Sequence, residues 1–220
     1  MTAIVLSRPA ESDPSGHRGI QLAVATTLAI WFVLIVSLGA AGAFVGPPGK
    51  PPLPMAIGVA SPILLFLAWM RASPAFREFV LSIDLRLNIA MQAWRWAGLG
   101  FIDLYAYKVL PAVFAFPAGL GDMAIGITAP WVILKLARRP DFAASSAFVR
   151  WNLLGILDLV VAISLGTLGA FLATGAPGEI STTPMSTLPL LLIPAYFVPL
   201  FLMLHIAALL QSRQLKRKGA

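Results

Sequence analysis

The chain has 220 residues, of which 59% are hydrophobic and only 11% are charged; its net charge is +7 and it contains no cysteine. Soluble domains carry about 25% charged residues, so this composition excludes a water-soluble fold. It also excludes an intrinsically disordered chain, which requires low hydrophobicity, and any disulfide framework or thiolate metal site.

Residues 1–19 are polar and are expected to form a cytoplasmic arm. Four later stretches are long and apolar enough to cross a bilayer, whose hydrocarbon core requires roughly 20 helical residues. They are residues 20–44, 55–70, 152–173 and 188–210. The first exceeds the 7–15 apolar residues of a cleavable signal sequence, so we expect an uncleaved anchor.

Residues 74–94 have apolar side chains at three- and four-residue spacing, a pattern typical of an amphipathic helix. The apolar positions are Phe76, Val80, Ile83, Leu87, Met91 and Trp94, and the polar positions opposite are Arg77, Asp84, Asn88 and Gln92. We therefore predict a helix lying flat on the cytoplasmic interface. A link between spans is the simpler interpretation of its role, and gating or docking is the alternative.

Residues 96–137 hold enough apolar residues for two further spans, predicted at 96–115 and 118–137. In this register Arg95 lies at the inner interface, and Asp103 and Lys108 are buried. In a second register the span begins near residue 88, Arg95 lies deep, and Lys108 to Pro111 forms the outer turn. We favour the first, because the amphipathic pattern already extends to residue 94.

The predicted fold class is therefore an all-α integral membrane protein with about six transmembrane helices in 20–210 and a basic tail at 211–220. The alternation of barrel strands is missing. With six spans, 14 of the 16 Lys and Arg residues fall on the side of the two termini. Positive loops stay inside, so we expect a multi-pass protein of the cell (cytoplasmic) membrane with both termini cytoplasmic.

The same bias explains the net charge, because basic residues favour anionic headgroups on the cytoplasmic face. The expected partners are thus the lipid bilayer, these headgroups and a small ion or solute, and no nucleic acid. The oligomeric state is left open.

Two segments share a pattern. Arg95-Trp96-x-x-Leu99-Gly100-x-x-Asp103-Leu104 matches Arg150-Trp151-x-x-Leu154-Gly155-x-x-Asp158-Leu159, and residues 37–44 match residues 164–171 in a similar way. These matches suggest three tandem helical hairpins. Tandem repeats are common in transporters, whose binding sites lie at the repeat interface.

Three aspartates fall at predicted membrane depth, where ionisable groups usually face a bundle interior or a watery cavity. They are Asp103, Asp122 and Asp158, and each follows a glycine by three residues. Small residues at this spacing let helices approach closely. Arg95, Lys108 and His205 are the candidate counter-charges.

No cofactor is predicted, since a haem held by two histidines would need a second suitable His and no metal-ligand spacing is present. A carboxylate-lined cavity for a cation or proton is one interpretation of the aspartates. A structural lock is the other.

Gly119-Leu120-Gly121-Asp122 resembles the G-x-G-D motif of intramembrane aspartyl proteases, the presenilin and signal-peptide-peptidase group. The resemblance implies that Asp122 and a second aspartate, here Asp103, activate water, with Pro194-Ala195-Tyr196 in the place of a Pro-Ala-Leu element. The sequence departs from that family: Ile102 stands where tyrosine precedes the partner aspartate, and Tyr196 replaces the leucine. We therefore assign no catalytic residue.

Prolines at 189, 194 and 199 interrupt the last span and predict a kinked helix that could hinge. Together with the aspartates and the repeat, they favour a small transporter or channel-like protein. A membrane scaffold or accessory subunit is the alternative, and the protease is the third hypothesis.

Overall fold

The computed structural model describes residues 14–218, and within this range the chain forms helices and connecting turns without strands. Five helices there are long and apolar enough to cross a membrane, which indicates a multi-pass membrane protein. They are α1 (Pro14–Ala40), α2 (Leu53–Ala72), α6 (Ala112–Arg138), α7 (Ser146–Phe171) and α8 (Val198–Lys218), the last continuing from the π-helical turn η4 (Ile193–Phe197).

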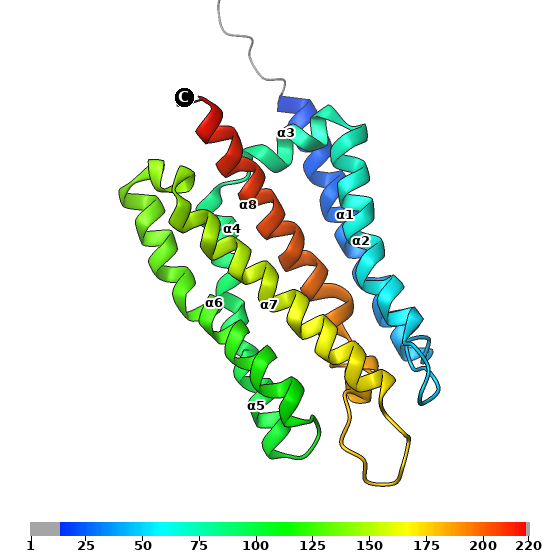
Figure 1. Ribbon diagram of the computed structural model, residues 1–220. Helices are drawn as coiled ribbons and strands as arrows, with labels where there is room; N and C mark the ends of the chain where they lie inside the picture. The colour runs from blue at the N-terminus through cyan, green and yellow to red at the C-terminus, as the bar shows by residue number, and fades with distance from the viewer. Residues whose placement is uncertain (1–13, 219–220) are drawn as a thin grey trace, which may run out of the picture.

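A sixth helical run is broken into three pieces and lies alongside α6 (Figure 1). It consists of α4 (Leu85–Gln92), the 3-10 helix η1 (Ala93–Gly98) and α5 (Leu99–Ala106), with 8, 6 and 8 residues. At a rise of about 1.5–2.0 Å per residue, the run is as long as a hydrocarbon core is thick. The remaining elements are α3 (Pro74–Ser82), η2 (Pro140–Ala144) and η3 (Thr183–Ser186).

The expected boundaries 96–115 and 118–137 differ from the structure, which has the second of the two registers. α5 ends at Ala106, the turn contains Lys108 with a φ of 58°, and Pro111 precedes the first residue of α6. Arg95 is 2% exposed. This deep position is tolerated because carboxylates from other helices neutralise the guanidinium, an option that the local sequence pattern does not reveal.

The single amphipathic helix predicted over 74–94 is also corrected. It breaks at Ile83–Asp84, and the Asp84 carboxylate caps α4 by accepting a hydrogen bond from the Arg86 amide at 2.8 Å. Asn88 and Gln92 are buried, whereas Leu87 on the opposite side is exposed. The polar face of α4 therefore points into the bundle, as expected where the surroundings are lipid.

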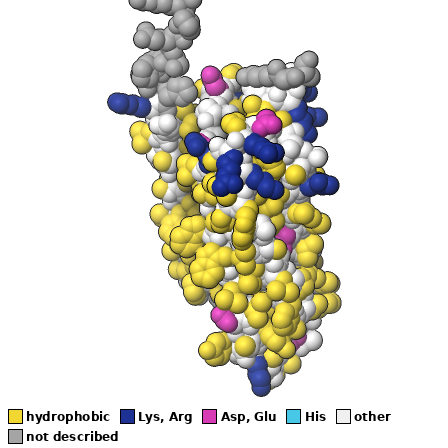
Figure 2. Space-filling view, turned by 90° about the vertical axis from the view of Figure 1, so that its left-hand side faces the viewer, with side chains coloured by type: hydrophobic (Ala, Val, Ile, Leu, Met, Phe, Trp, Pro, Cys, Tyr) yellow, Lys and Arg dark blue, Asp and Glu magenta, His cyan; other side chains and the backbone are white. Residues whose placement is uncertain are grey.

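The outer surface of the bundle is apolar. Figure 2 shows a broad belt of hydrophobic side chains with Lys and Arg gathered beyond one end of it. The beginning of α1 and the end of α8 lie at the same end of the molecule (Figure 1). Inside, α8 contacts α2, α4 and α7, so its side chains occupy the centre of the bundle.

Candidate functional site: a buried arginine–carboxylate cluster

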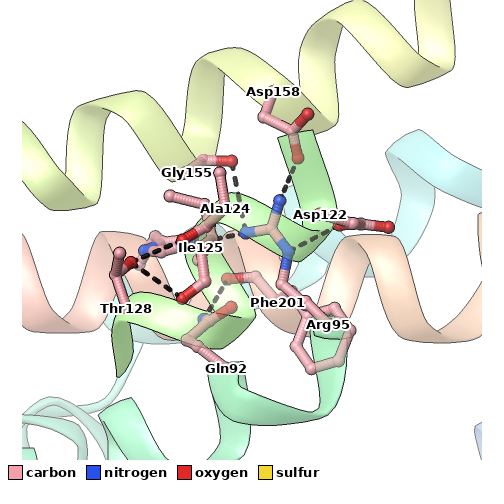
Figure 3. A network of polar contacts seen from close by, with 10 residues as sticks. Gln92, Arg95, Asp122, Ala124, Ile125, Thr128, Gly155, Asp158 and Phe201 are labelled. Atoms are coloured by element: carbon pink, nitrogen blue, oxygen red, sulfur yellow. Dashed lines mark hydrogen bonds and ion pairs between the residues drawn. The ribbon is translucent and has the colours of Figure 1, made fainter. Parts of the chain in front are cut away.

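Arg95 is the centre of a polar cluster inside the bundle (Figure 3). Its Nε donates to Asp122 Oδ1 on α6 at 2.7 Å, and its Nη2 pairs with Asp158 Oδ2 on α7. Its Nη1 lies 3.0 Å from His205 Nε2 on α8 and 3.5 Å from the Gly155 carbonyl. One guanidinium therefore connects η1 to three long helices.

His205 enters this cluster as a hydrogen-bond acceptor. Its Nδ1 lies 2.9 Å from Asn152 Oδ1, and the Asn152 amide group donates to the Phe148 carbonyl at 3.0 Å. The Asn152 oxygen is thus the acceptor, which places the imidazole proton on Nδ1 and leaves the Nε2 lone pair for Arg95. The neutral ring is consistent with its position beside a cation.

Glycines make the space in which the cluster forms. A Cβ on Gly126 of α6 would lie 2.7 Å from the Arg95 carbonyl carbon, so only glycine lets η1 approach this closely. A Cβ on Gly155 would run into the His205 ring. The glycine spacing that the sequence places near the aspartates therefore has a direct packing role.

The charges of the cluster do not cancel. Arg95 contributes one positive charge, Asp122 and Asp158 contribute two negative charges when ionised, and no other ion pair of the described chain involves these three. The carboxylates are 17% and 12% exposed, whereas the arginine side chain is fully enclosed. An unneutralised charge is costly in such surroundings, so the cluster is suited to take up one proton or another monovalent cation.

Two amides of α4 extend the polar region. Asn88 Nδ2 donates to the Leu204 carbonyl at 3.1 Å, and Gln92 Nε2 donates to the Phe201 carbonyl at 3.2 Å. Their side-chain oxygens are buried and have no partner within residues 14–218. Together with Arg95 they form a stripe at i, i+4 and i+7, which turns them toward the same side of the run. The amphipathic pattern predicted that both amides lie on the polar face of an interfacial helix, so their place beside the cluster was missed.

Asp122 also borders empty space. It lines a small cavity of about 60 Å³ between α2, α6, α7 and α8, which extends to Thr182 and Ser186 near the other end of the bundle. A second hollow of about 210 Å³, which contains Lys50 and Glu179, shares Ser186 with it. The cluster thus has a polar stripe on one side and a cavity on the other.

Glu179 organises the loop beside that hollow. Its carboxylate accepts hydrogen bonds from the Thr174 amide at 2.9 Å and the Gly175 amide at 2.7 Å. The Thr174 amide in particular holds the pKa of this carboxyl below its usual range. The loop therefore carries a local negative charge at neutral pH.

Of the six candidate residues, the structure brings four together. Arg95, Asp122, Asp158 and His205 form the cluster, whereas Lys108 lies exposed in the turn after α5. Asp103 is exposed on α5, and its side chain makes no hydrogen bond or ion pair within the described chain. It lines the same groove as Arg95 and Asp122.

The protease resemblance implies a pair formed by Asp103 and Asp122. In the described residues Asp122 is instead paired with Arg95, and the Tyr196 hydroxyl donates to the Leu28 carbonyl of α1 at 3.4 Å. Among residues 14–218, no group of three or more His, Cys, Asp and Glu side chains is arranged to hold a metal ion.

Comparison of the chain with curated proteins and with solved structures finds no match. A family model covers residues 52–212, which includes α2 through most of α8 and every residue of the cluster. By this match, the chain belongs to the family described as Domain of unknown function (DUF8737).

Proposed function

We propose that the protein is a six-crossing protein of the cytoplasmic membrane with both termini on the cytoplasmic side. The broken run α4–η1–α5 is the third crossing. With six crossings, the beginning of α1 and the end of α8 lie on the same side of the membrane. The concentration of Lys and Arg at that end supports the orientation, since basic loops stay inside. The three tandem hairpins remain a prediction within this topology.

In this membrane the protein is a small transporter whose exchange site is the Arg95 cluster. The observation that carries the proposal is that two carboxylates, Asp122 and Asp158, share one guanidinium in the interior. A proton or small cation that neutralises the excess charge stabilises the closed cluster, and its release leaves a buried negative charge. The cluster therefore responds to ion binding more strongly than a balanced ion pair.

Space on one side of the cluster and buried acceptors on the other support transport rather than storage. The cavity beside Asp122 leads toward the Lys50 and Glu179 hollow at the outer end. On the other side, the buried side-chain oxygens of Asn88 and Gln92 have no partner within residues 14–218 and leave two hydrogen-bond acceptors near Arg95. The cluster lies between them as the barrier.

The helices around the cluster can respond to a change in its charge. Asp122 and Asp158 stand on different helices, so neutralising one of them weakens the contact of Arg95 with that helix and leaves the other ion pair intact. The π-helical turn at η4, which contains Pro194, interrupts the regular hydrogen bonding just before α8. We assign to this turn the bending that couples the cluster to the outer end.

The second candidate function is a membrane scaffold, and a specific observation favours it. The Arg95 side chain is fully enclosed and is bonded to groups on α6, α7 and α8. A static lock that holds three helices would have the same contacts. The two functions differ in whether the carboxyl groups exchange their cation in the folded protein.

Carbodiimide labelling separates these functions, because an apolar carbodiimide reacts with protonated carboxyl groups within membranes. The folded protein is incubated with dicyclohexylcarbodiimide at several pH values, with and without added monovalent cations, and the labelled residues are identified by mass spectrometry. Asp141→Asn, which removes an exposed carboxylate in η2, is the matched control for Asp122→Asn and Asp158→Asn.

For a transporter we expect labelling of Asp122 or Asp158 in the folded protein, with a rate that falls as pH rises. Asp141→Asn leaves this labelling unchanged. Labelling that occurs only after unfolding, at every pH, would contradict the transport proposal and leave the scaffold.

A further inference from the structure

A groove of about 950 Å³ runs along the outside of the bundle between the α4–η1–α5 run and the segment 190–201. Its volume is in the range of sites for drug-sized ligands. Trp94 and Tyr107 are strongly exposed along it, whereas Phe101 is nearly buried. These helices form part of the hydrophobic belt on the outside of the bundle. The groove between them therefore opens toward the lipid and not toward water.

The charges on the groove are unusual for a lipid-facing surface. Its lining contains Asp103 and Asp122, and also Arg95, whose side chain is fully enclosed, among otherwise largely apolar side chains. Arg95 is already neutralised by Asp122 and Asp158, and Asp103 has no ion-pair partner in the described chain. The groove is therefore apolar along its length and negative at Asp103 and Asp122.

We propose that this groove binds a lipophilic organic cation, a monovalent ammonium or phosphonium with an aromatic or aliphatic body. The positive centre lies near the carboxylates, and the body lies against Trp94, Phe101, Phe197 and Phe201. Aromatic faces attract cations when both are removed from water. An anionic or neutral ligand of the same shape gains none of this attraction.

This inference rests on the proposed function, since it names the substrate class of the exchange site. Asp122 belongs both to the groove and to the cluster. A cation that binds beside Asp122 supplies the positive charge that a proton would otherwise supply. Binding of the organic cation and binding of the proton are therefore competitive, which is the basis of exchange.

Equilibrium dialysis of the purified full chain in detergent tests the inference, with tetraphenylphosphonium as the probe. Tetraphenylborate, which has nearly the same shape and the opposite charge, is the matched ligand control. Protein-free micelles correct for partition into detergent. We expect saturable binding of tetraphenylphosphonium and none of tetraphenylborate.

Two variants test the location without touching the Arg95 cluster. Asp103→Asn removes one charge from the groove, and we expect about tenfold weaker binding, the change that 1.4 kcal/mol produces. Gly100→Phe fills the groove with a side chain; since a Cβ at Gly100 meets nothing within 4 Å, the fold should tolerate it and binding should be lost. Asp141→Asn, away from the groove, should bind as the parent protein does.

Equal binding of tetraphenylphosphonium and tetraphenylborate would overturn the inference, because the groove would then accept any apolar molecule, including an acyl chain. Unchanged binding in Gly100→Phe would also overturn it. Failure of this inference is distinguishable from failure of the proposed function. If the protein binds no tetraphenylphosphonium but is labelled at Asp158, the inference about the groove ligand fails and the transport proposal stands. If it binds the probe but resists labelling, the transport proposal fails and the groove still binds the cation.

Discussion

Two segments with the same sequence pattern occupy opposite environments. In the first, Arg95 is buried and Asp103, eight residues later, is exposed; in the second, Arg150 is exposed and Asp158 lies in the interior. The buried arginine of one segment pairs with the buried aspartate of the other. The two matching segments thus provide the two halves of one ion pair rather than two equivalent sites.

Backbone geometry accounts for the difference. Arg95 lies in the 3-10 helix η1, which packs against α6 through Gly98 and Gly126, whereas Arg150 lies in the regular helix α7, near its beginning. A 3-10 segment changes the direction of every side chain that follows it. Residues at matching positions of the two segments therefore need not point in the same direction relative to the bundle interior.

The largest expected effect comes from removing the buried arginine. Arg95→Gln leaves two carboxylates without a counter-charge, and we expect a loss of about 3–5 kcal/mol in the free energy of unfolding. Arg150→Gln, the matched change in the second segment, should stay within about 0.5 kcal/mol. Reversible unfolding in mixed detergent micelles measures both, and similar losses would show that the two segments are equivalent after all.

The corresponding glycines give the next contrast. Gly155→Ala places a methyl group in the His205 ring, and we expect destabilisation of about 1–3 kcal/mol from overpacking. Gly100→Ala enters open space in α5 and should be neutral or stabilise the helix by up to about 1 kcal/mol. The same unfolding measurement applies, and a tolerated Gly155→Ala would argue against close packing at His205.

Neutralising one aspartate should cost less than removing the arginine. Asp158→Asn leaves the balanced pair Arg95–Asp122, so we expect a loss of about 1 kcal/mol, whereas Asp122→Asn together with Asp158→Asn should cost about 3–5 kcal/mol because the buried guanidinium is left unpaired. Asp103→Asn, the exposed equivalent, should leave stability unchanged. Equal effects of the single and double variants would contradict the shared arrangement.

The smallest expected effect concerns the loops that follow the two segments. The folded-state pKa of Glu179 is lowered from its ordinary value of 4.5. The carboxylate therefore stabilises the loop at pH values above 4.5, and this stabilisation is lost as pH falls through the folded-state pKa. Amide exchange at Thr174 and Gly175, relative to the intrinsic rate, should therefore quicken on acidification. In the turn after α5, the Lys108 and Val109 amides donate to the backbone carbonyls of Tyr105 and Leu104. No carboxylate within residues 14–218 accepts from these amides, so their exchange should show no such dependence.

Glu179→Gln is the control for this last prediction. The variant should remove the pH dependence at Thr174 and leave the turn after α5 unaffected. Hydrogen exchange followed by mass spectrometry resolves both loops in one sample. Acid sensitivity that persists in Glu179→Gln would show that another group holds the loop.

Hydropathy alone located four of the long helices, because α1, α2, α7 and η4–α8 coincide with uninterrupted apolar stretches. The same reasoning singled out Asp122, Asp158 and His205 as ionisable residues within apolar helices, and the structure places all three beside Arg95. It failed between residues 74 and 117. There a helix break at Ile83–Asp84 and a 3-10 segment at 93–98 changed which side chains face the interior.

The roles of Asn88, Gln92 and Asn152 could not be predicted from the sequence. Each is uncharged and acquires its function only from a neighbour more than 50 residues away: Leu204, Phe201 and His205, respectively. Such contacts depend on tertiary packing, which periodicity within one helix does not encode. Arg95 was assigned to the interface for the same reason, because its partners stand on other helices.

Infrared spectroscopy of the protein in lipid tests the central claim most directly, because a protonated carboxyl group in an apolar site has a C=O stretch separate from that of ionised carboxylates. We predict such a band at neutral pH, which disappears in Asp158→Asn, persists in Asp103→Asn and weakens when tetraphenylphosphonium is added. A spectrum without this band, or one in which Asp158→Asn leaves it unchanged, would contradict the claim that the Arg95 cluster holds an exchangeable proton.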